Sequence, residues 1–140
     1  NHFTSKELLD DPVGSETTKR SVMPLEEQGV LDLMDGETEL APGITAFPTP
    51  GHTPGHMSLL IASGNKRALL VGDILGSPMQ ATETDYRYTP DWNAEMGIQA
   101  RKTILDQAEK ENAVVFGSHL SYPGWGTMIR WDGRRYWQAL

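Results

Sequence analysis

One segment constrains this chain more than any other: residues 49–56 read Thr-Pro-Gly-His-Thr-Pro-Gly-His. Two further short elements, Gly72-Asp73 and Ser118-His119, each follow an apolar run. A strand would end at such a point, and its last side chain would face a cleft. Imidazole and carboxylate groups are ligands that zinc and similar ions take from proteins. The order of these three elements therefore predicts a metal site assembled from loops that lie far apart in the sequence.

The bulk composition fits an ordinary globular protein. A chain of 140 residues, 38% of them hydrophobic, can form one modest domain, so we expect a single domain over residues 1–140. The net charge of −7 argues against a nucleic-acid partner. No apolar run approaches the roughly 18 residues that a membrane span needs, so we expect no membrane partner. Cysteine is absent, which excludes thiolate ligands and leaves the compartment undetermined.

The hydrophobic pattern predicts mainly short strands after a helical start. A helix is expected over residues 5–28, interrupted at residues 12–14 and restarted at Pro24. Residues 72–89 show no sustained period and are expected to form a long loop. The pattern predicts strands over residues 30–34, 39–40, 44–47, 57–62, 67–71, 113–116, 127–131 and 134–137.

One long helix is predicted between Asp91 and Asn112, with Asp91 or Asn93 as its N-cap. Its apolar residues recur every fourth position and should face a sheet. These are Met96, Ala100, Ile104 and Ala108, with Leu105 widening the stripe. The pattern assigns the charged residues to other faces: Arg101, Lys102, Asp106 and Glu109.

These elements resemble the metallo-β-lactamase superfamily. Residues 49–56 are similar to its Pro-Gly-His-Thr-x-Gly-His signature, and the Gly-Asp and Ser-His elements to its later metal-binding segments. The loop at residues 77–80 and the turn at residues 119–126 resemble the branch of methyl parathion hydrolase-like and acyl-homoserine lactone lactonase-like enzymes. The resemblance implies an α/β (α+β) fold, half of a four-layer αβ/βα sandwich, with mainly one mixed or antiparallel sheet and covering helices. The chain would form its C-terminal half, with the upstream half apparently absent.

The resemblance also implies metal ligands. His52 would bind a first ion, Asp73 would bridge two ions, and His119 would bind the second. Zinc is the expected ion, although manganese, iron or cobalt suits the same donors. Such ions lower the pKa of water and polarise a scissile carbonyl or phosphoryl group.

Four neighbouring residues are given supporting roles. His56 is expected to order the loop around it by hydrogen bonding rather than to bind metal. Three aromatic residues lie next to the site loops and are candidates for lining a substrate pocket. These are Tyr86, Tyr88 and Trp125.

The family's main metal motif, His-x-His-x-Asp-His, does not occur in this chain. Each ion would then have two ligands here, whereas catalytic zinc normally has three from the protein. We therefore expect weak metal binding and poor activity from this chain alone. Half of a sandwich also exposes a sheet face, so the apolar runs at residues 59–61 and 69–71 must be covered, by a missing N-terminal half or by self-association.

Two functions remain open at this point. The first is a binuclear-metal hydrolase, or a fragment of one, that directs activated water at a small-molecule lactone, ester, β-lactam or phosphotriester. The second is a non-catalytic, truncated module of the same fold that acts as an assembly or binding partner. A nuclease of the same superfamily is disfavoured by the acidic net charge.

Overall fold

The structure, a computed structural model, describes Asp10 and residues 12–140. The chain divides into two compact units, Asn1–Asp35 and Gly36–Leu140. The expectation of a single domain over residues 1–140 stays a prediction. In the described residues no helix is both long and apolar enough to cross a membrane.

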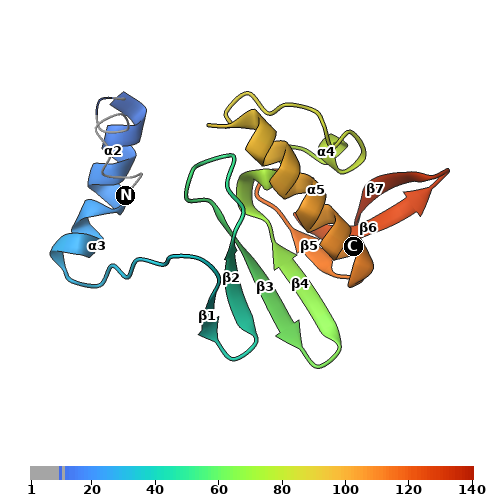
Figure 1. Ribbon diagram of the computed structural model, residues 1–140, viewed down its shortest axis with the longest axis horizontal. Coiled ribbons are helices and arrows are strands. Elements are labelled where there is room, and N and C mark those ends of the chain that lie inside the picture. Colours follow the sequence, from blue (N-terminus) through green and yellow to red (C-terminus); the bar gives the residue numbers. More distant parts are fainter. Residues whose placement is uncertain (1–9, 11) are drawn as a thin grey trace. The chain divides into compact units, whose positions relative to one another are not determined.

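The first unit contains two short helices, α2 (Pro12–Ser21) and α3 (Met23–Glu27) (Figure 1). The predicted interruption at residues 12–14 is wrong, because these three residues are helical and belong to α2. The predicted restart at Pro24 is confirmed, since α3 begins at Met23 with Pro24 in its first turn. The part of the predicted helix before Asp10 lies outside the described residues.

The predicted strand over residues 30–34 is also wrong. This segment has no regular structure, and Val30 and Leu33 are 63% and 72% exposed. Apolar residues favour a strand only when a neighbouring strand is available to pair with them. No strand is described within residues 12–35, so residues 30–34 have no neighbouring strand in this unit to pair with.

The second unit is built on one seven-stranded sheet in which each strand pairs with its neighbours in sequence order. Only β4 and β5 are parallel, and the remaining neighbours are antiparallel. The sheet is therefore mixed, as expected for the fold class. Its strands are β1 (Thr38–Ala41), β2 (Ile44–Pro48), β3 (Met57–Ser63), β4 (Lys66–Leu70), β5 (Val114–Phe116), β6 (Trp125–Trp131) and β7 (Arg134–Ala139).

One face of this sheet packs against helix α5 (Ala94–Lys110), which crosses it in Figure 1. The register aligns Leu60 with Leu69, and Leu69 with Val115, so their side chains share this face. Together with residues of α5 they form the core. Its fully buried members include Leu69, Val71, Leu75, Ile104, Leu105, Ala108 and Val115.

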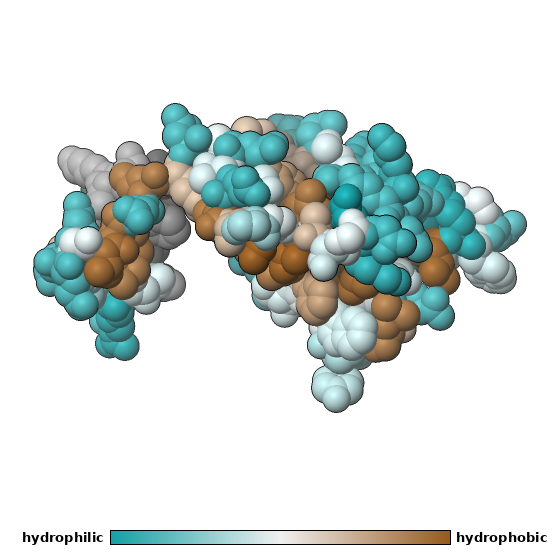
Figure 2. Space-filling view, turned by 90° about the horizontal axis from the view of Figure 1, so that it is seen from below, coloured by the Kyte–Doolittle hydropathy of each residue, from teal (hydrophilic) through white to brown (hydrophobic). Residues whose placement is uncertain are grey.

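The opposite face is apolar as well, and we call it the open face. The register places Leu59 beside Leu70, Leu70 beside Phe116, and Phe116 beside Trp125. Phe116 and Trp125 are 38% and 37% exposed, and Ile129 on β6 is 36% exposed. Apolar residues gather over this unit between hydrophilic margins (Figure 2). The helices of this unit pack against the buried core, which leaves these residues without a helix over them.

One expectation about α5 is confirmed and one is wrong. Asn93 caps the helix, with its side chain accepting a hydrogen bond from the backbone N–H of Met96, so Asp91 is free for another role. The apolar stripe holds at Ile104 but not at Met96, which is 38% exposed. Met96 lines a groove of about 440 Å³ between β2 and α5.

Arg101 is the larger exception, because its charge led us to expect it on another face of the helix and the structure buries it to 1% exposure. The predicted loop over residues 72–89 is partly helical. It contains a 3-10 turn, η2 (Gly72–Ile74), and a short helix, α4 (Met79–Thr82). Ala81 of α4 belongs to the buried core, which explains why this segment is ordered.

Candidate active site

Three loops meet at one edge of the sheet, and the topology explains why. Strands β4 and β5 are parallel, so their carboxyl ends lie at the same edge. Strand β3 is antiparallel to β4, so its beginning lies at that edge too. His52 precedes β3, Asp73 follows β4, and His119 follows β5. The fold therefore brings together the three residues that the sequence singled out.

Asp73 lies between the two histidines. Its Oδ2 atom is 3.5 Å from Nε2 of His52, and its Oδ1 atom is 3.1 Å from Nε2 of His119. Each carboxylate oxygen thus faces a different imidazole. Across the part of the chain that the structure describes, no group of three or more His, Asp or Glu side chains is arranged to hold a metal ion. These contacts join pairs of donors rather than a complete set.

The donors suit zinc in kind, because zinc binds imidazole nitrogen and carboxylate oxygen. They fall short in number, since a shared Asp73 would leave each ion with one histidine and one carboxylate oxygen. Side-chain exposure is 20% for His52, 36% for Asp73 and 44% for His119, so additional ligands can reach the donors from outside.

His56 lies behind the site rather than in it. Its Nε2 atom accepts a hydrogen bond from the backbone N–H of Asp73 at 3.3 Å, and its Nδ1 atom is 2.9 Å from Oγ1 of Thr49. A neutral ring that accepts at Nε2 carries its proton on Nδ1 and donates it to Thr49. Burial lowers the pKa of His56, which favours this neutral form. The contacts join two site loops, as the predicted loop-ordering role requires.

Gly72 makes that contact feasible. Its φ of +55 lies in the left-handed region that favours glycine. A Cβ atom at this position would lie 2.8 Å from Nε2 of His56. Any larger residue would push the imidazole away from the backbone of Asp73.

Asp91 is a site residue that the sequence reasoning missed. Its Oδ1 atom is 3.2 Å from Nδ1 of His52, and its side chain is only 3% exposed. A carboxylate on Nδ1 fixes the orientation of an imidazole and directs Nε2 toward its ligand. The backbone supports this contact, because Trp92 N–H donates to the carbonyl of His52 at 3.1 Å. Two signals could have found it: Asn93 already caps the helix, and Arg101 falls in phase with buried residues.

The three aromatic candidates lie in different places. Tyr88 stacks on His52, with ring centroids 5.9 Å apart, and is tilted toward His119 at 6.1 Å. Tyr86 is 57% exposed. Trp125 stacks on Phe116 on the open face, at 6.0 Å. Of these three candidates, only Tyr88 has a described ring contact with His52 or His119.

The chain belongs to the metallo-beta-lactamase superfamily, whose family model matches residues 5–119. Among curated proteins, an N-acyl homoserine lactonase of Bacillus cereus is 31% identical over 87 residues, which are 62% of this chain and 34% of that protein. An N-acyl homoserine lactonase of a Bacillus species is 29% identical over the same share of both chains. This chain therefore spans about a third of the length of these relatives. The resemblance to the lactonase-like branch is confirmed.

Solved structures agree on the fold. AidC, a dizinc quorum-quenching lactonase solved with a product, is 26% identical, with a TM-score of 0.71 over 98% of this chain and 48% of AidC. The hydrolase AbOPH of the beta-lactamase superfamily is 21% identical, with a TM-score of 0.81 over 99% of this chain and 51% of AbOPH. The predicted fold class is confirmed.

Proposed function

We propose that this chain supplies one side of the active site of a metal-dependent hydrolase. The observation that carries the proposal is the position of Asp73, whose two carboxylate oxygens face the Nε2 atoms of His52 and His119. A carboxylate shared between two imidazoles at a sheet edge is the arrangement that two neighbouring cations would use.

The roles of the residues follow from their contacts. His52 and His119 would each hold one zinc ion, and Asp73 would bridge the pair. Bound zinc would lower the pKa of water and polarise the carbonyl or phosphoryl group of the substrate. Asp91 would orient His52 through Nδ1, and His56 would hold the backbone of Asp73.

The substrate would be a small molecule with a lactone, ester, β-lactam or phosphotriester centre. The lactonase relatives favour a lactone among these. Tyr88 would form one wall of the binding pocket, because its ring stacks on His52 and lies 6.1 Å from the ring of His119. Tyr86 and Trp125 are weaker candidates, since neither ring contacts the site histidines in the structure.

Zinc titration by calorimetry tests the proposal. We expect weak binding by the chain alone, since each ion has two ligands instead of three. Asp73→Asn should abolish the heat signal, because it removes the shared charge. Asp85→Asn is the matched control: this carboxylate lies in the following loop, pairs with Lys102, and should leave binding unchanged.

Two outcomes would contradict the proposal. Equal zinc binding by Asp73→Asn would remove Asp73 from the site. Tight binding of two zinc ions by the isolated monomer would contradict the statement that each ion has only two ligands from this chain. At zinc concentrations at which the wild-type chain binds the ion, it should hydrolyse a lactone faster than the Asp73→Asn variant does.

A second candidate function rests on the open face. Phe116, Trp125 and Ile129 are each more than a third exposed, and Leu59 and Leu70 continue the same surface. Apolar patches of this kind mark interfaces. The chain would then act as an assembly module whose open face is covered by the other half of the fold or by a second copy.

A further inference from the structure

A single buried side chain touches residues that support three parts of the candidate site: the Asp73 turn, the Tyr88 loop and the partner of His52. Arg101 of α5 donates from Nε to the carbonyl of Ile74 at 3.0 Å. It donates from Nη1 to the carbonyls of Thr84 at 2.8 Å and Tyr86 at 2.9 Å. Its Nη2 atom lies 3.9 Å from Oδ2 of Asp91. Four separate points in the chain are thus held by one guanidinium.

Each of these points adjoins a site residue. Ile74 directly follows Asp73, and Tyr86 is two positions before Tyr88. Asp91 contacts Nδ1 of His52 through its other oxygen. The guanidinium therefore links the segment that carries the bridging carboxylate, the loop that carries the aromatic wall, and the partner of the first histidine.

Stability alone does not account for this placement. A buried charge is costly to desolvate, and an apolar residue of similar volume packs as well or better in such a position. Oδ2 of Asp91 is buried and has no hydrogen-bond partner among the described residues, so Arg101 supplies its nearest positive charge. Gly97 leaves room for that carboxylate, because a Cβ there would lie 2.7 Å from Oδ2.

We propose that Arg101 is the positioning residue of the active site: its guanidinium sets the Asp73 turn, the Tyr88 loop and the Asp91–His52 pair in register with one another. The inference rests on the metal-binding role proposed above for His52 and Asp73. A positive charge at position 101 is not sufficient to hold these segments together. The guanidinium reaches three carbonyls because its donors are fixed in a planar fork, whereas the ammonium group of lysine is a compact point charge.

The test compares Arg101→Lys and Arg101→Met with the wild-type chain in the metal-free state. Nuclear Overhauser effects between the ring protons of Tyr88 and those of His52 report the arrangement directly. We expect both variants to lose these effects, and zinc affinity to fall about 10- to 100-fold, the range for partners that orient metal ligands.

Leu105→Ala is the matched control. Leu105 lies on the same helix and is fully buried, but its contacts are with the core. This variant should lose stability in chemical denaturation and still keep the Tyr88–His52 effects. Loss of these effects in Leu105→Ala would reduce Arg101 to a general stabilising residue. Their retention in Arg101→Lys would show that the charge alone is enough, and would also overturn the proposal.

A measurement on the wild-type chain covers the case in which the Arg101 variants do not fold. The Nε–H proton of Arg101 should exchange slowly with water and show a coupling to the carbonyl of Ile74. A fast-exchanging, averaged signal would overturn the proposal. Failure of the metal-binding function looks different: the wild-type chain would show the Tyr88–His52 effects and bind no zinc.

Discussion

Gly76 and Tyr88 show how a single missing side chain shapes the candidate site. A Cβ atom at position 76 would lie 2.5 Å from a carbon of the Tyr88 ring. The Tyr88 ring thus occupies the space that the side chain of any other residue at position 76 would fill. Because Tyr88 also stacks on His52, the absence of a side chain at Gly76 decides how closely an aromatic wall approaches the imidazoles.

Gly76→Ala should therefore displace the Tyr88 ring. The φ angle of Gly76 is not in the left-handed region, so the effect is steric, and overpacking of this kind costs about 1–3 kcal/mol. We expect lower stability in urea denaturation and weaker Tyr88–His52 Overhauser effects. Gly55→Ala is the control, because a Cβ there meets nothing within 4 Å. Identical behaviour of the two variants would refute the close contact.

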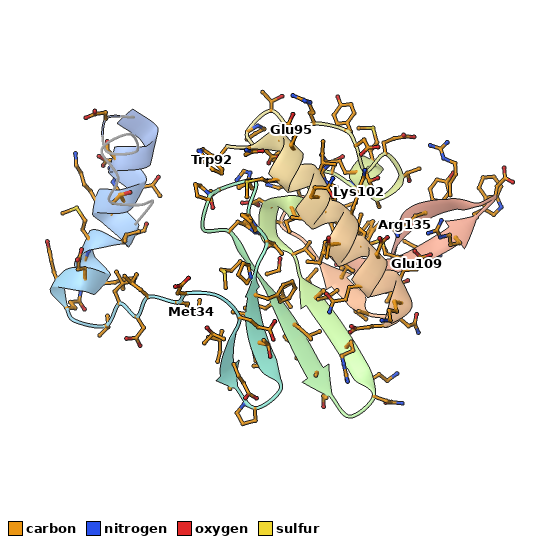
Figure 3. The ribbon with its side chains drawn as sticks, in the orientation of Figure 1. Met34, Trp92, Glu95, Lys102, Glu109 and Arg135 are labelled. Carbon is orange, nitrogen blue, oxygen red and sulfur yellow. The ribbon has the colours of Figure 1, made fainter. Side chains whose placement is uncertain are left out.

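At the scale of elements, a cluster of charges fastens α5 to the β6–β7 hairpin. Glu109 on the helix accepts hydrogen bonds from Arg130 at 2.9 Å and from Arg135 at 2.9 Å (Figure 3). Arg135 also pairs with Asp106. The hydrogen bond from Arg130 is the main reason that the pKa of Glu109 falls to about 2. A carboxylate that is harder to protonate in the folded chain stabilises the fold whenever it is charged.

The sign of the pH dependence follows from this shift. The pKa of Glu109 is lower in the folded chain than its ordinary value of 4.5, so its contribution is complete above pH 4.5 and is lost as the pH falls toward 2. Glu109→Gln should lower the free energy of unfolding by about 1 kcal/mol at pH 7, and this gap should close in acid.

Denaturation at a series of pH values measures this gap. Glu95→Gln serves as the control, since Glu95 pairs with Arg87 but both side chains are more than two-thirds exposed. That variant should differ little from the wild-type chain at any pH. A gap for Glu109→Gln that stays constant between pH 7 and pH 2 would contradict the assignment.

At the scale of the whole molecule, the open face predicts self-association of this chain. The double variant Phe116→Lys and Ile129→Lys should abolish it, because two charges would have to be buried in any interface formed there. Both residues are more than a third exposed, so the fold itself should tolerate the change. Size-exclusion chromatography with light scattering measures the outcome.

Met96→Lys is the control for that experiment, because Met96 has a similar exposure of 38% but lies on α5. It should leave association unchanged. A wild-type chain that stays monomeric at high concentration would contradict the prediction, as would a double variant that associates like the wild-type chain.

Local pattern was sufficient for much of the fold. The hairpin of β3 and β4, the antiparallel β6 and β7, and the core residues of α5 such as Ile104 follow directly from hydrophobic periodicity. It failed where an element depends on a distant partner. Residues 30–34 have strand propensity without a neighbouring strand, and the buried position of Arg101 depends on carbonyls 15 to 27 residues away.

The same distinction between local pattern and distant contacts applies to the candidate site. By itself, the amino-acid sequence determined which side chains are candidates for binding metal, because His52, Asp73 and His119 stand in segments that resemble the family's signatures. Only the tertiary structure decided that Asp91 contacts His52, that Tyr88 stacks on His52, and that Arg101 contacts the backbone of Ile74 and Tyr86. Those contacts depend on where separate strands end relative to one another, and the parallel pairing of β4 with β5 sets that geometry across more than forty residues of intervening chain.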